Sequence, residues 1–207
     1  MNISDIYTKY SIPTNLQRHM LTVAALADYI CDYLDGVSVD KDLVIKTCLL
    51  HDMGNIIKFN FDDPSLLDED DRQRIDELRE IRLQYLKKYG RTPDKATIAI
   101  IKEITSDVRV GKVCESGHWD VNFDEVEKFV WESKIVCYAD MRVGPFGILP
   151  IRERFANLTE RRPESKEKIM EILEHGLKLE RSLQSVSRVD LTEIGDQKID
   201  IQFSYEI

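Results

Sequence analysis

One stretch of this 207-residue chain decides how the rest is interpreted, Leu49-Leu50-His51-Asp52-Met53-Gly54-Asn55-Ile56. Here an imidazole and a carboxylate follow an apolar run that predicts a helix over 43–52, with Gly54 as a plausible stop. Neighbouring side chains on a helix diverge by about 100°, so His51 and Asp52 can meet on a common object only near the helix end. A divalent cation is such an object, because imidazole and carboxylate are both good ligands for it.

A second candidate ligand lies on an earlier helix, which we predict over about 14–34. The apolar stripe of this helix is formed by Leu16, Met20, Val23, Ala27, Ile30 and Leu34. His19 lies on the same side, three or four residues from members of the stripe. Such a histidine is either a core residue satisfied by a carbonyl or a water, or an inward-facing ligand. This helix alone leaves both alternatives open.

A third candidate lies near the end of a helix predicted over about 122–142. Apolar residues fill one face of this helix turn after turn, and Asp140 follows on the same line. A buried carboxylate without a partner costs roughly several kcal/mol. Asp140 therefore needs either an arginine, such as Arg142 or Arg18, or a bound cation, and Asp52 raises the same requirement.

Together, three predicted helices present four ligand-type side chains: His19, His51, Asp52 and Asp140. The chain has only four histidines, and two of them belong to this pattern. Two imidazoles and two carboxylates suit a divalent metal cation such as Mn, Fe, Co, Ni, Zn or Mg, and they leave positions for water and substrate. We therefore predict a mixed nitrogen–oxygen metal site.

The remaining sequence predicts more helices and a short tail. We expect helices over about 70–89, 95–105, 149–158 and 163–186, and an irregular segment over 106–121. His118 in that segment is as typical of a site-lining loop as of a surface turn. In the tail, residues alternate around Gly195-Asp196, which predicts a β-hairpin. We divide the chain into a helical domain, residues 1–186, and a tail, residues 187–207.

Composition describes an ordinary globular protein, with 43% hydrophobic and 32% charged residues. No apolar run approaches the roughly 18 residues of a membrane span, and the N-terminus lacks the features of a signal peptide. Four scattered cysteines without a Cys-x-x-Cys pair indicate reduced thiols. We expect a cytoplasmic protein with no membrane partner, and we leave open whether it forms a homo-oligomer.

The net charge of −9 argues against binding of a nucleic acid backbone, which requires a basic face. It does not exclude a small phosphorylated molecule, because a metal and a few local cations can neutralise one inside an acidic envelope. We expect such a molecule as the partner.

At this point a resemblance becomes visible in three segments. The order His19, His51-Asp52, Asp140 resembles the H…HD…D signature of the HD-domain metal-dependent phosphohydrolase superfamily. The flanking segments are similar as well: Gln17-Arg18-His19-Met20-Leu21-Thr22-Val23-Ala24, the stretch quoted above, and Tyr138-Ala139-Asp140-Met141-Arg142-Val143-Gly144-Pro145. The resemblance spans about residues 12–160. It implies an all-α fold, an HD-domain helical bundle, to which we add the small C-terminal β-hairpin.

The resemblance also implies a bound divalent metal and hydrolysis of phosphate mono- or diesters, commonly on nucleotides. A divalent metal polarises a phosphoryl oxygen and makes hydroxide available near neutral pH, while positive side chains stabilise charge on the phosphoryl oxygens. The candidates for contacting substrate are Arg18, Lys58, Arg109, Lys112 and Arg142, with His118 as a further ligand or substrate contact.

Two departures from the family pattern concern the mechanism and the number of metal ions. Some nucleotidase members place a carboxylate three residues after the motif aspartate, where this chain has Asn55. An amide orients a water but cannot take its proton, so the general base stays open between Asp52, Asp62, Asp63 and the metal alone. Binuclear members carry additional histidines between the motifs. This chain offers only His118 there, which favours one ion and leaves open a second, partly water-ligated one.

We therefore predict a metal-dependent phosphohydrolase acting on a small phosphorylated substrate, most plausibly a nucleotide, with Asp52, Arg18 and Asn55 in catalytic roles. Two alternatives remain. Asn55 favours a non-catalytic regulatory module that binds metal and nucleotide. A di-iron oxygenase is less favoured, because the chain lacks the additional histidines.

Overall fold

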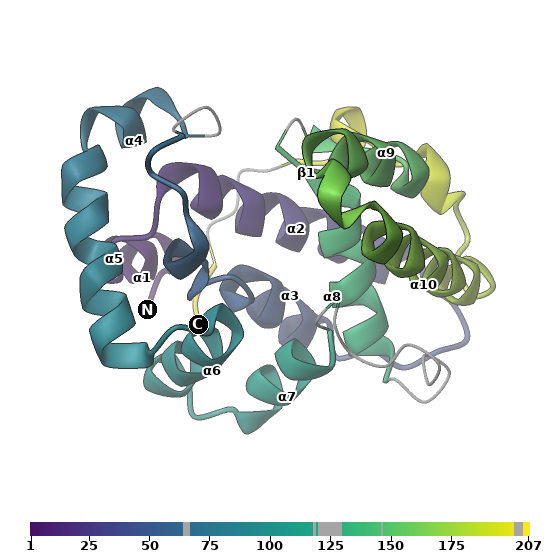
Figure 1. Ribbon diagram of the computed structural model, residues 1–207. Coiled ribbons are helices and arrows are strands. Elements are labelled where there is room, and N and C mark those ends of the chain that lie inside the picture. Colours follow the sequence, from purple (N-terminus) through teal and green to yellow (C-terminus); the bar gives the residue numbers. More distant parts are fainter. Residues whose placement is uncertain (64–66, 118, 120–129, 146, 201–204) are drawn as a thin grey trace.

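The computed structural model describes residues 1–63, 67–117, 119, 130–145, 147–200 and 205–207. Within these residues the chain forms ten α-helices and one two-stranded antiparallel sheet, so the predicted all-α class is confirmed (Figure 1). The helices are Ile3–Lys9 (α1), Thr14–Tyr33 (α2), Lys41–Leu50 (α3), Glu69–Gln73 (α4), Ile75–Tyr89 (α5), Pro93–Ile104 (α6), Val108–Ser116 (α7), Trp131–Arg142 (α8), Ile151–Arg161 (α9) and Lys166–Gln184 (α10). The strands are Val143–Gly144 (β1) and Gly147–Ile148 (β2). Short 3-10 helices span Asn55–Lys58, Pro163–Ser165, Leu191–Glu193 and Asp196–Lys198.

Helix α2 is the centre of the core. Its fully buried residues are Met20, Val23, Ala24, Leu26, Ala27 and Ile30. A helix buried over so much of its surface must be packed on several sides, and α3 and α8 both pack against α2. Each large apolar side chain buried in this way contributes roughly 1.5–3 kcal/mol to stability. The three helices associated with the predicted metal ligands therefore pack against one another at the centre of the core.

Two predicted segments differ from the structure. The helix expected over 70–89 is interrupted at Arg74 and divides into α4 and α5. The segment expected to be irregular contains α7, in which Val110, Val113 and Cys114 are buried at the three- and four-residue spacing of an amphipathic helix. The helix predicted over 122–142 ends at Arg142 as expected, but Val130 is extended and α8 begins at Trp131. Residues 120–129 lie outside the described residues.

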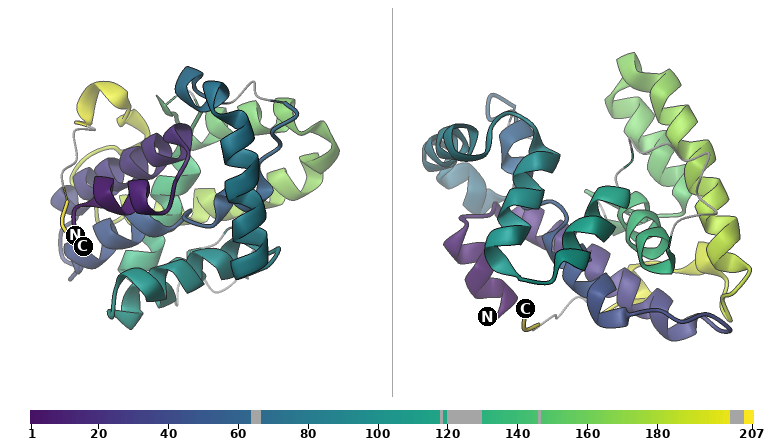
Figure 2. Two further views of the ribbon diagram at one scale, coloured as in Figure 1. Left: turned by 90° about the vertical axis from the view of Figure 1, so that its left-hand side faces the viewer. Right: turned by 90° about the horizontal axis from the view of Figure 1, so that it is seen from below.

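Helices α9 and α10 form an arm on one side of the molecule. The right-hand view of Figure 2 shows them running side by side, away from the side formed by α4 to α7. α10 packs against α8 as well as α9, so the arm is attached to the helix that carries Asp140.

The tail returns to the core through Arg142, whose side chain is fully buried. Its guanidinium donates to the carbonyl oxygens of Leu191 at 2.7 Å and Ile194 at 2.6 Å. The Asp196 carboxylate in turn accepts the backbone N–H of Ile148 at 2.9 Å. Farther on, the two chain ends lie together, where the Ile3 N–H donates to the Tyr205 carbonyl oxygen at 2.9 Å (Figure 1).

The described residues contain one small antiparallel hairpin. The described residues place it at β1 and β2, directly after α8, rather than in the tail. Around Gly195-Asp196, where the alternation predicted strands and a turn, the structure has two 3-10 helices. The tail turns there because its carbonyl oxygens are directed to Arg142 and its Asp196 carboxylate to β2. Residues 201–204 of the predicted second strand lie outside the described residues.

Two composition-based expectations concern membranes and cysteines. Among the described residues, no helix is both long enough and apolar enough to cross a bilayer. All four cysteines are free thiols, and Cys48, Cys114 and Cys137 are buried.

Gly54 is required by close packing rather than by a left-handed backbone. Its φ is −91°, a conformation open to any residue. A Cβ at this position would overlap the carbonyl oxygen of Pro93 and lie 2.7 Å from the amide nitrogen of Thr97, both at the start of α6. The Gly54 N–H also donates to the Thr97 hydroxyl at 2.9 Å. The turn after His51-Asp52 is thus pressed directly onto α6.

We expect Gly54→Ala to lower the free energy of unfolding by about 1–3 kcal/mol, because the added methyl group overpacks this contact. Gly111→Ala is the matched control. Gly111 lies inside α7 with no atom within 4 Å of its would-be Cβ, so alanine there should stabilise by roughly 0.5–1 kcal/mol through helix propensity. Urea unfolding of both variants measures the difference; equal stability of Gly54→Ala and the parent would contradict the tight contact with α6.

Candidate metal centre

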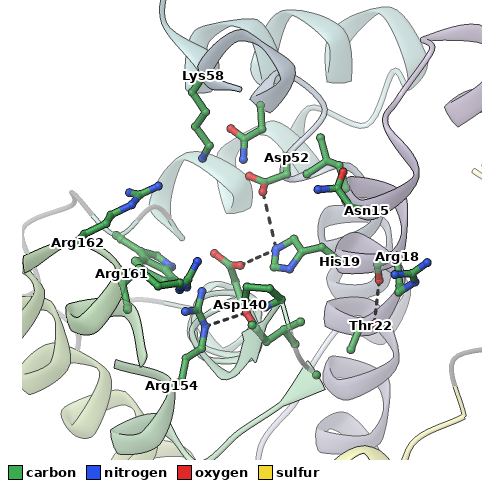
Figure 3. A pocket seen from close by; sticks show the side chains of 18 of the residues that line it. Asn15, Arg18, His19, Thr22, Asp52, Lys58, Asp140, Arg154, Arg161 and Arg162 are labelled. Atoms are coloured by element: carbon green, nitrogen blue, oxygen red, sulfur yellow. Dashed lines mark hydrogen bonds and ion pairs between the residues drawn. The ribbon is translucent and has the colours of Figure 1, made fainter. Parts of the chain in front are cut away.

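Four predicted ligands from three helices meet at one point. His19 comes from α2, His51 and Asp52 from the end of α3, and Asp140 from the last turn of α8. His19 Nε2 lies 3.0 Å from Asp140 Oδ1 and 3.8 Å from Asp52 Oδ2. His51 Nε2 lies 3.5 Å from Asp140 Oδ1 and 3.8 Å from Asp52 Oδ2. These distances show that the four side chains converge, and Figure 3 shows three of them, His19, Asp52 and Asp140.

His51 and Asp52 converge because α3 ends directly before them and both residues lie in the turn that follows. α3 finishes at Leu50, and the chain continues through tight turns in which the Asn55 N–H donates to the Asp52 carbonyl oxygen at 2.9 Å. The rings of His19 and His51 lie with their centroids 5.3 Å apart. Ligand-type atoms of His19, His51 and Asp140 all lie within 4.8 Å of one another.

The tautomer of His51 is fixed by the backbone. Its Nδ1 lies 2.7 Å from the carbonyl oxygen of Cys48, and a carbonyl can only accept, so Nδ1 carries the hydrogen. Nε2 is then left as the atom that faces Asp52 and Asp140, and among the described residues it has no hydrogen-bond partner. A buried histidine whose Nδ1–H is held by a backbone carbonyl oxygen, with Nε2 directed at carboxylates, is the usual arrangement of a metal-ligating histidine.

The C-terminal ends of α3 and α8 add negative electrostatic potential at this cluster. His51 is the C-terminal cap of α3, and Asp140 lies in the last turn of α8. The C-terminal end of a helix carries partial negative charge, which favours a nearby cation and disfavours a carboxylate. Asp140 therefore needs positive charge beside it. The mixed imidazole–carboxylate set fits a divalent metal ion, and the unpaired Nε2 of His51 is the observation in this structure that tests and supports that fit.

In the absence of a metal, a proton fills the same role. Burial would lower the pKa of His51, but the carboxylates of Asp52 and Asp140 raise it to about 9. Burial would raise the pKa of Asp140, but the charge on His51 and the hydrogen bond from His19 hold it well below its usual range. The cluster is thus arranged to keep a carboxylate ionised next to a cation.

A cavity of about 740 Å³ opens beside the cluster. His19, Asp52, Asn55 and Asp140 line one wall, and residues of α9 and the start of α10 line the opposite wall. The side chains of His19, Asp52 and Asp140 are 21–22% exposed, so they face the cavity. Trp119, stacked on Phe155 with ring centroids 5.5 Å apart, lies in the same lining.

Three other predicted site residues also line this cavity, and each lies differently. Asn55 is only 3% exposed and begins the 3-10 helix after the His-Asp pair. Lys58 ends that helix and is exposed. Arg18 lies at the edge, where its guanidinium is paired with Asp68 at 2.9 Å. Figure 3 shows the Arg18 side chain on the far side of α2 from Asp140.

The remaining predicted substrate contacts do not reach the cavity in the described residues. The prediction for Arg142 is wrong, because its guanidinium is buried and occupied by the tail carbonyls. Arg109 lies on α7, paired with Asp107 at 2.6 Å and Asp40 at 2.8 Å, outside the cavity lining. His118 lies outside the described residues.

The sequence analysis missed three arginines that do line the cavity: Arg154, Arg161 and Arg162. Arg154 is buried, with 9% of its surface exposed, and its Nε donates to the Val143 carbonyl oxygen at 3.1 Å. A signal was present, since arginine at positions 154, 161 and 162 recurs after seven and eight residues, which places all three on one face of a helix. It was overlooked because the segment lies after the last motif.

We expect the apparent affinity of the protein for Mn²⁺ to rise roughly tenfold per pH unit between about pH 6 and 8 and to level off near pH 9, because the metal must displace a proton from His51. The effect on the metal-free protein has the opposite sign. The raised pKa contributes stability that is fully present below about 6.5 and is lost as the pH rises through about 9.

Calorimetric titration with Mn²⁺ in two buffers of different ionisation enthalpy measures both the affinity and the proton release. His175→Gln, a histidine on α10 outside the cavity lining, is the control and should leave the pH dependence unchanged. An affinity that is flat between about pH 6 and 8 would show that His51 is not a ligand.

Comparison with known proteins agrees with this geometry. A family model described as HD domain matches residues 16–140, which is more than half of the 207 residues and includes all four converging side chains. Searches among curated proteins and among solved structures gave no match. The match begins in α2 and ends at Asp140, so it includes the first two segments of the resemblance and the beginning of the third. The chain belongs to the HD domain family, whose members are generally hydrolases.

Proposed function

We propose that this protein is a metal-dependent phosphohydrolase that acts on a small phosphorylated molecule, most plausibly a nucleotide. The single observation that carries the proposal is the buried Nε2 of His51, which has no hydrogen-bond partner in the part of the chain that the structure describes and lies beside His19 and Asp140, two residues of a cavity lining. A divalent ion held by His19, His51, Asp52 and Asp140 would polarise a phosphoryl oxygen and lower the pKa of a bound water. The cavity volume of about 740 Å³ falls within the range usual for small-molecule sites.

The roles of the chain's own residues follow from their positions. Asp52 and Asp140 are both partly exposed, but Asp52 lies farther from the imidazoles, 3.8 Å from each Nε2. Of these two carboxylates, Asp52 is therefore the better placed to accept a proton from water. Asn55 follows it in the same lining and would orient that water through its amide. Neither role needs a carboxylate at position 55.

Arg154 is the cation best placed for the phosphoryl group. Its guanidinium is buried in the lining close enough to Asp140 for the two charges to interact, and among the described residues its Nη1 has no hydrogen-bond partner. A guanidinium with free donors matches the oxygens of a phosphate. We assign to Arg154 the part that the sequence analysis gave to Arg109 and Arg142, while Lys58 and Arg18 remain candidates at the edge of the cavity.

A nucleotide is favoured by the aromatic side chain in the lining. Trp119 is stacked on Phe155 and contributes an aromatic surface to the cavity, and aromatic faces bind nucleobases with about 1–3 kcal/mol per base. This supports a nucleotide over a simple phosphorylated sugar or polyol.

The second candidate function is a regulatory module that binds metal and nucleotide without hydrolysing it. Asn55 favours this alternative, because the position three residues after Asp52 is buried in the cavity wall and holds an amide that cannot take a proton.

A panel of phosphomonoesters, phosphodiesters and nucleotides, assayed with Mn²⁺, Co²⁺, Mg²⁺ and Ni²⁺, separates the two. We expect metal-dependent release of phosphate from at least one nucleotide. Binding of Mn²⁺ and nucleotide without any turnover would favour the regulatory module instead.

We further expect Asp140→Asn to lose both activity and the rise in melting temperature that Mn²⁺ causes, because a ligand that binds only the folded state stabilises it in proportion to its affinity. Asp76→Asn is the control, a 90% exposed carboxylate on α5 outside the cavity, and should keep both properties. A thermal shift with Mn²⁺ that survives Asp140→Asn would remove Asp140 from the metal site.

A further inference from the structure

Three arginines line the cavity on the side formed by α9 and the residue that follows it. We call Arg154, Arg161 and Arg162 the arginine wall; the first two belong to α9, and the third directly follows it. All three lie beyond residue 140, outside the part of the chain that matches the HD domain. The wall is therefore a feature that the family match does not account for.

The hydrogen bonds of the arginine wall go to neutral acceptors. Among the described residues, no carboxylate forms an ion pair with any of the three. Arg154 donates to the Val143 carbonyl oxygen at 3.1 Å and Arg161 to the amide oxygen of Asn157 at 3.2 Å, both neutral acceptors. By contrast, Arg18 and Arg109 are each bound to carboxylates.

The three guanidinium groups also act on one another. The pKa of Arg154 is lowered to about 10, chiefly by burial; Asp140 opposes this shift, and Arg161 and Arg162 contribute to it. The pKa of Arg161 is lowered by burial and then by Arg162. Arg154 is buried, Arg161 is half-buried and Arg162 is exposed, so the repulsion between these like charges is strongest toward Arg154. An anion from outside would relieve this repulsion, although the chain as a whole has a net charge of −9.

Two further charged residues of the cavity lining, Asp196 and Lys58, bear on whether the arginine wall can receive a ligand. Asp196 also lines the cavity, but its carboxylate accepts the N–H of Ile148 at 2.9 Å and packs against Gly147. In Figure 3 the Lys58 side chain points from the opposite side of the cavity toward the wall. Lys58 and the arginine wall therefore present positive charge to the same space.

The members of the arginine wall lie at different distances from Asp140. Arg154 lies beside Asp140 and is the member whose charge interacts with that carboxylate. Figure 3 shows Arg162 farther from Asp140, on the side from which Lys58 enters. A phosphoryl group at the metal centre would meet Arg154, and the other two arginines would remain without a partner.

We propose that Arg161 and Arg162 hold a second anionic group of the ligand, so that the substrates are small molecules with two anionic groups, such as two phosphates. The assignment of the first group to the metal centre rests on the proposed function. The second group is recognised through guanidinium–oxyanion hydrogen bonds, which do not require a metal. Specificity is then set by the arm of α9 and α10 rather than by the HD motifs.

The test compares ligands with one and with two phosphates on the Mn²⁺-loaded protein. Adenosine 5′-monophosphate carries one phosphate; adenosine 5′-diphosphate and adenosine 3′,5′-bisphosphate carry two. Calorimetric titrations with equal excess Mn²⁺ in cell and syringe are run on the parent, on the double variant Arg161→Gln/Arg162→Gln, and on Arg152→Gln. Arg152 is an exposed arginine on α9 outside the cavity lining, so it controls for the loss of charge.

We expect the parent to bind at least one two-phosphate ligand about tenfold more tightly than the monophosphate, and the double variant to lose about tenfold of that affinity while its monophosphate affinity changes little. Arg152→Gln should match the parent. An unchanged Mn²⁺ affinity and circular dichroism spectrum establish that the double variant is folded. Equal losses for one- and two-phosphate ligands, or no loss for either, would overturn the proposal.

The same proteins distinguish the failure of this inference from the failure of the proposed function. Selective loss of two-phosphate binding without turnover of any nucleotide would support the arginine subsite and count against the hydrolase. Turnover of nucleotides with no preference for a second phosphate would overturn the subsite and leave the hydrolase intact.

Discussion

The structure depends on compensating one carboxylate at the point where three core helices meet. Asp140 lies at the end of α8, where the helix dipole opposes its charge, and it is held by His19 at 3.0 Å and faces His51 at 3.5 Å. Those imidazoles are delivered by α2 and by the end of α3, so the packing that buries Met20, Val23 and Ile30 also brings the ligands together. The same helix contacts thus form the core and the ligand cluster. If the helices separated, Asp140 would lose both imidazole partners, and where the helices meet its charge needs a cation beside it.

The sequence predicted the convergence of His19, His51, Asp52 and Asp140 because each of these residues breaks a local pattern. His19 and Asp140 stand on apolar faces, and His51-Asp52 ends an apolar helix, so burial cost alone required a partner for the acids. The same reasoning failed for Arg142 because its partners are backbone carbonyls about fifty residues downstream, which no local pattern records. It missed Arg154, Arg161 and Arg162 because their relevance depends on α9 packing across the cavity from the motifs. Long-range placement, rather than local propensity, accounts for the differences.

The two walls of the cavity have different origins in the chain. The wall with His19, Asp52, Asn55 and Asp140 belongs to the segment that matches the HD domain, and the opposite wall belongs to α9 and the start of α10. Chemistry that the family shares can therefore be kept on one side while the other side varies with the ligand. Asn55 lies on the first of these walls, in the segment that matches the HD domain.

The contact between Arg142 and the tail has a consequence for how the protein is made. Arg142 ends the helix that carries Asp140, and its guanidinium donates to the carbonyl oxygens of residues 191 and 194, which are synthesised later. While the ribosome is still translating the arm, the earlier helices can already pack, but the buried guanidinium has no acceptors from the tail. Its other acceptors, the Tyr138 hydroxyl and the Leu149 carbonyl oxygen, come earlier in the chain, so the hydrogen bonds of this guanidinium are complete only after Ile194 has been synthesised.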